Sequence, residues 1–201
     1  DIQSGAIHNF ASAYRVTRDE RWLDEAHRVL RYVRERLTAP EGGFYTSQDA
    51  DLGRHGEPGA MDGHDFYALS AERRAALGEP RIDRAVYANR NGRMIAALCQ
   101  LYAASLDPEV RELAQAAADR LLAHHLSGDG FRHGTETGEL LHLADQVEMA
   151  RGLLALHEAT ADPRYLDAAE RTVDFMRREL AAPGGGFYAH TADENAVGVF
   201  A

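Results

Sequence analysis

Three segments of the sequence repeat one pattern, and this repeat constrains the fold more than any other feature. In each segment an apolar stretch ends in a short turn, an Asp follows, and an amphipathic stretch runs on to a glycine-phenylalanine stop. The three residues are Asp19, Asp107 and Asp162. An Asp at a helix start accepts hydrogen bonds from first-turn N–H groups, so each is predicted to cap a helix. Pro108 and Pro163 follow two of them, at the first helical position, where a missing N–H costs nothing.

The glycine-phenylalanine stop recurs at nearly the same distance in all three segments. The aromatic residues Phe44, Phe131 and Phe187 lie 22, 21 and 22 residues after Trp22, Val110 and Tyr165. Glycine before each phenylalanine supplies the positive φ with which a chain leaves a helix. This agreement predicts three helical hairpins, at about residues 3–38, 91–126 and 146–181.

The two helices of each hairpin differ in their apolar pattern. The first is apolar on most sides, whereas the second has one apolar face and charges elsewhere, so the first helices should lie inside and the second outside. We therefore predict one all-α domain, 1–201, whose three hairpins form part of an (α/α)6 toroid. A glycine-rich loop insertion, about residues 46–90, interrupts it. Within the insertion, Ser70 is predicted to cap a short helix that runs to Leu77.

Composition limits the partners of the chain. Its net charge is −10, and its basic residues are interleaved with acids, so neither a nucleic acid nor an anionic membrane is an expected partner. No apolar run approaches the roughly 20 residues of a membrane span. The chain has a single cysteine, Cys99, and no signal-peptide pattern, which favours a cytoplasmic protein. A start without Met suggests a fragment.

The sequence offers no motif for a metal or a cofactor. The ten histidines are scattered, and no pair has the HExxH spacing of a zinc site. The glycines follow helices, whereas a phosphate-binding loop places them before a helix. We therefore expect neither a metal nor a cofactor.

The hairpin geometry brings the glycine-phenylalanine stops and the starts of the first helices to one end, where polar residues gather. We predict a substrate pocket at this end. The candidate catalytic residues are Asp49, Asp51 and Asp145. The candidate substrate-binding residues are Tyr45, Gln48, Arg90, Asn91, Gln146 and Tyr188. The same end also holds His55, His133 and Glu194.

Each group of candidates has a second explanation. Asp49 and Asp51 could share acid/base work or hold the hydroxyls of a sugar. They could equally accept backbone N–H groups and shape the loop. Asp145 and Gln146 could be no more than the start of a helix. By the repeat, Gln146 is equivalent to Asn91 and to Gln3.

The run Gly42-Gly43-Phe44-Tyr45-Thr46-Ser47-Gln48-Asp49-Ala50-Asp51 resembles the YyaL-like, thioredoxin-domain-containing family. The segments 63–70 and 90–95 resemble two further motifs of that family, with Arg90 in place of its usual Trp. This resemblance implies the (α/α)6 barrel part of such a protein, similar to N-acylglucosamine 2-epimerase and six-hairpin glycosidase folds. The thioredoxin-like domain and its cysteines have no counterpart here, so no redox activity is expected.

Two functions are consistent with the predicted fold and the polar end. The first is a carbohydrate-active domain, epimerase-like or glycosidase-like, in which Tyr45 and Tyr188 stack on a sugar-like small molecule. The alternative is a non-catalytic helical scaffold that binds a protein or peptide and serves an attached thioredoxin-like domain. Three hairpins fall short of six, so the remainder of the barrel or a second copy is an expected partner.

Overall fold

A computed structural model describes residues 2–54, 56–135 and 140–193 of the 201-residue chain. His55 and Glu194, assigned to the polar end, lie outside these residues. The architecture is mostly helical, and no helix in the described part of the chain is long and apolar enough to span a bilayer.

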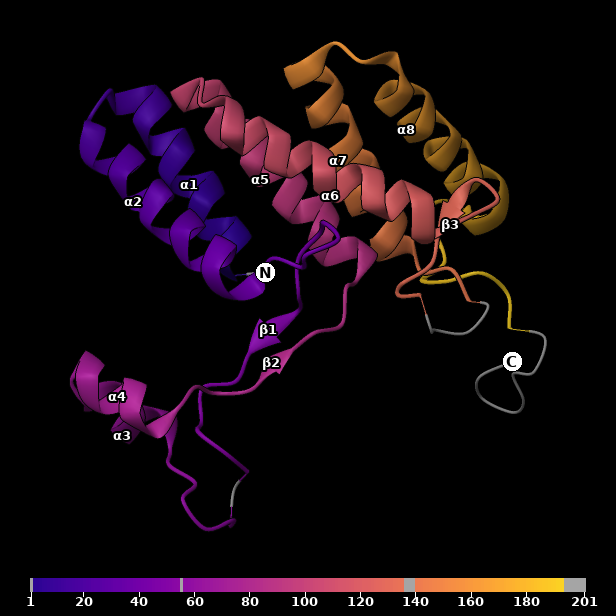
Figure 1. Ribbon diagram of the computed structural model, residues 1–201. Helices are drawn as coiled ribbons and strands as arrows, with labels where there is room; N and C mark the ends of the chain where they lie inside the picture. The colour runs from indigo at the N-terminus through magenta and orange to yellow at the C-terminus, as the bar shows by residue number, and fades with distance from the viewer. Residues whose placement is uncertain (1, 55, 136–139, 194–201) are drawn as a thin grey trace.

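Three helical hairpins form the body, as the repeat predicts (Figure 1). The hairpins are α1 (Ile2–Thr17) with α2 (Glu20–Tyr32), α5 (Ala88–Ser105) with α6 (Pro108–His124), and α7 (Leu143–Thr160) with α8 (Pro163–Phe175). A π-helical turn extends α2 over Val33–Leu37 and another extends α8 over Met176–Leu180. The sequence pattern does not predict these two turns.

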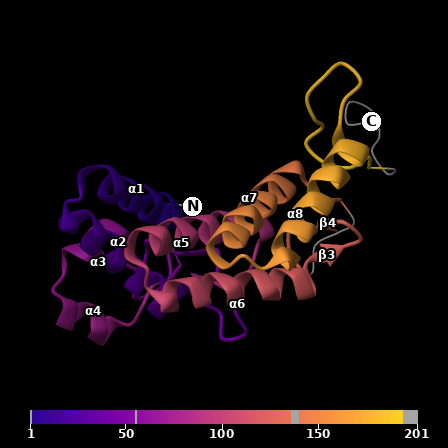
Figure 2. The ribbon, with the colours of Figure 1, turned by 90° about the horizontal axis from the view of Figure 1, so that it is seen from above.

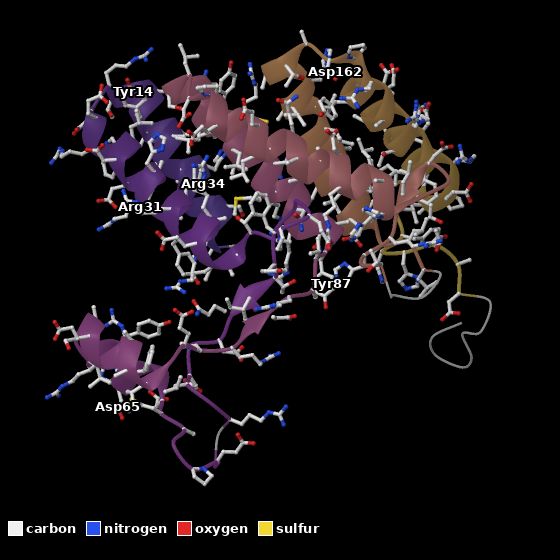
Figure 3. All side chains as sticks on the ribbon, viewed as in Figure 1. Tyr14, Arg31, Arg34, Asp65, Tyr87 and Asp162 are labelled. Carbon is white, nitrogen blue, oxygen red and sulfur yellow. The ribbon has the colours of Figure 1, made fainter. Side chains whose placement is uncertain are left out.

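Asp residues cap the second helix of every hairpin, which confirms the prediction. The side chains of Asp19, Asp107 and Asp162 each accept a hydrogen bond from the backbone N–H two residues further on, at 3.1, 2.9 and 2.9 Å. Figure 3 places Asp162 at the end of the body that holds these short turns and Tyr87 at the opposite end. We call that opposite end, with its glycine-phenylalanine loops, the loop end.

The first helices pack against one another, with α5 between α1 and α7, and each second helix packs mainly on its own partner (Figure 2). The contact between α5 and α7 is the most extensive in the body. Gly92 and Gly152 allow it, since a Cβ on Gly92 would lie 2.3 Å from the carbonyl oxygen of Glu148. One apolar core runs through all three hairpins, and its largest buried side chains include Tyr165 and Phe131.

The loop insertion forms an arm that projects from the loop end (Figure 1). Its base is an antiparallel pair of two-residue strands, β1 (Ser47–Gln48) and β2 (Ile82–Asp83). Its tip carries α3 (Gly63–Ala68) and α4 (Ala71–Leu77), the latter capped by Ser70 as the sequence predicts. A second strand pair, β3 (Leu126–Ser127) with β4 (Gly130–Phe131), follows α6.

Candidate functional site

Asn91 in the first turn of α5 holds the glycine-phenylalanine loop of the preceding hairpin. Its side-chain Oδ1 accepts the backbone N–H of Phe44 at 2.7 Å, and its Nδ2 donates to the carbonyl of Phe44 at 3.1 Å. Nδ2 also donates to the carbonyl of Tyr87 at 2.9 Å. The amide is fully buried, so these bonds satisfy both of its polar atoms in place of water.

Gln146 in the first turn of α7 makes the same set of contacts one repeat later. Its Oε1 accepts the N–H of Phe131 at 2.7 Å, while Nε2 donates to the carbonyls of Phe131 and His142 at 2.8 and 3.0 Å. We call each such amide pairing an amide clamp. Asn91 and Gln146 were predicted to bind substrate, but their amides are occupied by the backbone and are buried.

Asp145 lies next to the second clamp and pairs with a histidine. Its carboxylate is completely buried and accepts the backbone N–H of Asn89 at 2.9 Å. Its two oxygens lie 3.0 and 3.1 Å from Nδ1 of His133. The imidazole of His133 also stacks on the ring of Tyr87, with centroids 4.1 Å apart. The sequence places both residues at the loop end but does not indicate this pairing.

The pairing of His133 with Asp145 has a chemical consequence. A carboxylate at Nδ1 favours the tautomer that carries its proton there, and this leaves Nε2 on the opposite side of the ring as the basic nitrogen. The His133 side chain is 29% exposed. A histidine oriented in this way has the geometry of a general acid or base at Nε2.

A cavity of about 310 Å³ opens between α1, the loop after α2 and the start of α5. Its lining includes three predicted substrate-binding residues, Tyr45, Gln48 and Arg90, together with Gln3 and Tyr32. Tyr32 donates its hydroxyl hydrogen to Oε1 of Gln48 at 2.9 Å, which fixes that amide. The guanidinium of Arg84 lies 5.8 Å from the ring centre of Tyr45. We call this hollow the loop-end cavity.

Asp49 and Asp51 lie on the arm, apart from the helical body that holds Asp145. The carboxylate of Asp49 forms an exposed ion pair with Arg81 at 3.0 Å. The carboxylate of Asp51 accepts the backbone N–H of Gly63 at 2.7 Å, at the start of α3. The first contact joins the two sides of the arm at its base, and the second closes the loop of residues 52–62 within the arm. Tyr188 is 55% exposed on the third glycine-phenylalanine loop.

The inner helices also carry a charged cluster that the sequence reasoning missed. Glu148 of α7 is nearly buried and pairs with Arg93 of α5 at 2.9 Å and with Arg151 at 2.8 Å. These three side chains and His8 line a second hollow of about 320 Å³. The spacing of Glu148 and Arg151 on one helix face is a signal for half of this cluster. Across the described residues, no group of three or more His, Cys, Asp or Glu side chains gathers as metal ligands would.

No protein-family model and no curated protein matches this sequence. Solved structures do match its fold. A D-mannose isomerase is 18% identical with a TM-score of 0.70, covering 94% of this chain and 43% of its own. A sugar epimerase from a ruminal bacterium is 18% identical with a TM-score of 0.68, covering 90% of this chain and 44% of its own. An α-mannanase from Bacteroides thetaiotaomicron is 14% identical with a TM-score of 0.69, covering 96% and 46%.

These likenesses define the class of fold. The chain has the fold of part of an (α/α)6 toroid, as in the D-mannose isomerase, the sugar epimerase and the α-mannanase. It spans less than half the length of each of these three structures. The predicted fold class, part of an (α/α)6 toroid, is thereby confirmed.

Proposed function

We propose that this chain is the substrate-binding part of a carbohydrate-active (α/α)6 protein, YyaL-like in its loop motifs, that acts on a sugar-like small molecule. The observation that carries the proposal is the loop-end cavity, where Tyr45 and Gln48 of the segment after α2 meet Arg90 of α5. The aromatic ring of Tyr45 and the guanidinium of Arg90 suit the faces and the hydroxyls of a sugar, while Gln48 shapes the cavity wall through its bonds to Tyr32 and to the carbonyl of Pro80. The sugars handled by proteins of the same fold support this substrate class.

Within this proposal we assign the acid/base chemistry to His133 and Asp145, which lie at the same end of the body as the loop-end cavity but are not among the residues that line it. The buried carboxylate orients the imidazole, and we assign to Nε2 the exchange of a proton with the substrate. Asp49 and Asp51 then hold the arm, in keeping with their contacts to Arg81 and to the backbone of Gly63. Asp145 is the one of the three candidate carboxylates that we retain in a catalytic role.

Ligand binding tests this proposal directly. A panel of D-mannose, D-glucose and D-glucuronate is titrated while the melting temperature and ligand-observed NMR signals are followed. We expect at least one sugar to bind, and Tyr45→Leu or Arg90→Gln to weaken it about tenfold or more, equivalent to about 1.4 kcal/mol. The control is Tyr67→Leu, since Tyr67 is an exposed tyrosine on the arm. If no sugar binds, or if the control weakens binding equally, the proposal fails and the helical-scaffold alternative is favoured.

A further inference from the structure

The third glycine-phenylalanine loop has the same backbone structure as the first. In the first loop, Tyr45 N–H donates to the carbonyl of Leu37 at 2.8 Å, and Ala39 N–H donates to that of Gly43 at 3.0 Å. In the third loop, the equivalent bonds join Tyr188 to Leu180 at 2.8 Å and Ala182 to Gly186 at 3.1 Å. Each phenylalanine forms an antiparallel bridge to the end of its own helix, at Thr38 or Ala181. The third loop is therefore fully formed.

The first and third loops differ in the hydrogen-bond partners of the phenylalanine backbone. Because neighbouring backbone groups in an extended segment point to opposite sides, the N–H and C=O of Phe44 point away from its own helix, toward Asn91. The N–H and C=O of Phe187 also point away from their own helix, but no side-chain amide among the described residues forms hydrogen bonds with them. The side chains follow the backbone: Phe44 and Phe131 are 3% and 0% exposed, whereas Phe187 is 50% exposed.

An apolar stripe beside the third loop is uncovered as well. Val147 and Leu154 of α7 are 38% and 40% exposed. One repeat earlier, the equivalent positions on α5 are Gly92, which touches the backbone of α7, and Cys99, which is buried. On the outer helix α8, Val173 is 36% exposed, whereas Leu30 of α2 and Ala118 of α6, at the equivalent positions, are buried. The outward side of α7 and α8 thus repeats an internal contact surface of the toroid.

The opposite edge of the body carries the complementary group. By the sequence repeat, Gln3 near the start of α1 corresponds to Asn91 in α5 and to Gln146 in α7. In both of those helices the amide clamps the loop of the preceding hairpin. By the same register, Gln3 is placed to clamp the loop of a hairpin that precedes α1.

We propose that the surface formed by Phe187, Val147 and Leu154 docks a further helical hairpin whose inner helix carries Asn or Gln in its first turn. That amide accepts the N–H of Phe187 and donates to its carbonyl, and the hairpin covers the apolar stripe. The amide is the element of recognition, because an apolar helix without it leaves two backbone groups buried and unpaired. Matching toroids are more than twice as long as this chain, which leaves room for such a hairpin in the fold.

A tandem protein tests the proposal, with a second copy of the chain as the probe. Two whole copies are joined head to tail by a flexible Gly/Ser linker of about 15 residues, so that α1 of the second copy reaches the third loop of the first at millimolar effective concentration. Hydrogen exchange of the Phe187 amide in the first copy is the readout. Amides of Phe44 and Phe131, which are already clamped, report that the fold is intact.

We expect the Phe187 amide to exchange at least about tenfold more slowly in the tandem protein than in the single chain. Gln3→Ala in the second copy should restore fast exchange, whereas Gln3→Asn should keep it slow. Leu154→Asp in the first copy should also restore it. The proposal is overturned if Phe187 exchanges equally fast in both proteins, or if Gln3→Ala leaves it protected while Phe44 and Phe131 stay protected.

Discussion

Gly92 on α5 and Gly152 on α7 face each other where the two inner helices approach most closely. A Cβ on Gly152 would lie 2.7 Å from the carbonyl oxygen of Gly92, and a Cβ on Gly92 would lie within 2.3–2.7 Å of the backbone at Glu148 and Met149. Real side chains do not tolerate such distances to backbone atoms. The spacing of the inner helices, and hence the relative positions of Asn91 and Gln146, depends on these two glycines.

Replacing Gly92 with alanine should therefore push the two inner helices apart. We expect Gly92→Ala to lower the free energy of unfolding by about 1–3 kcal/mol, the usual cost of overpacking, measured by urea denaturation. Gly5→Ala in α1 is the matched control, because a Cβ there meets no atom within 4 Å. The control should be neutral or up to about 1 kcal/mol more stable, since alanine favours a helix over glycine. Equal effects of the two substitutions would contradict this account.

Removing an amide clamp should destabilise the chain more than removing an exposed amide. Gln146→Ala leaves the N–H and C=O of Phe131 buried without partners, so we expect a loss of about 2–4 kcal/mol in the free energy of unfolding. Gln100→Ala serves as control, since its amide lies in a partly exposed position with bonds to Arg15 and Ser12. That variant should lose less than about 1 kcal/mol. Chemical denaturation monitored by circular dichroism measures both.

Acid should destabilise the chain through His125. Burial lowers the pKa of this histidine, and the nearby charges of Arg120 and His124 act in the same direction against the hydrogen bond to Val86. As the pH falls below about 6.5, His125 is protonated in the unfolded chain but stays neutral in the folded chain. The free energy of unfolding therefore falls on acidification. The melting temperature should fall less between pH 7 and pH 5 in His125→Gln than in the unmodified protein. The exposed neighbour His124, changed to Gln, should alter the slope less than His125→Gln does, because burial is the largest cause of the lowered pKa of His125 and the charge of His124 is one of the smaller ones.

Cys99 should resist thiol reagents while the chain is folded. Burial, assisted by the charge of Glu158, raises the pKa of its thiol to about 12, so the reactive thiolate is scarce near neutral pH. We expect Ellman's reagent at pH 8 to label the folded chain at least about a hundredfold more slowly than the guanidinium-unfolded chain. The same shift lowers stability above about pH 9, where only the unfolded chain loses the proton. Rapid labelling under native conditions would contradict the buried position.

The helical part of the fold follows from local sequence signals. Asp19, Asp107 and Asp162 indicate where three helices begin, and the recurring glycine-phenylalanine pairs indicate where they end. The spacing of these residues along the chain is therefore enough to predict the hairpins. The π-helical turns at Val33–Leu37 and Met176–Leu180 do not follow, since their residues continue an ordinary helical pattern. Nor does the strand pair at the base of the arm, whose partners are about 35 residues apart.

The candidate site was predictable in position but not in its contacts. The repeat places Asn91, Gln146 and Asp145 at the loop end, where the structure has them. Whether an amide faces a substrate or a backbone depends on distances between segments up to 47 residues apart, as for Asn91 and Phe44. No local pattern contains such a distance, so the roles of these residues emerge only from the three-dimensional structure.

The strand pair at the base of the arm separates the arm from the helical body. The chain leaves the body through β1 and returns through β2, the adjacent antiparallel strand, so the insertion starts and ends at nearly one point. The segment between the two strands can therefore be lengthened, shortened or exchanged at a small cost in loop entropy, while the three helical hairpins keep their geometry. The arm is therefore a suitable place to graft a new segment beside the loop-end cavity, because Gln48 of β1 lines that cavity.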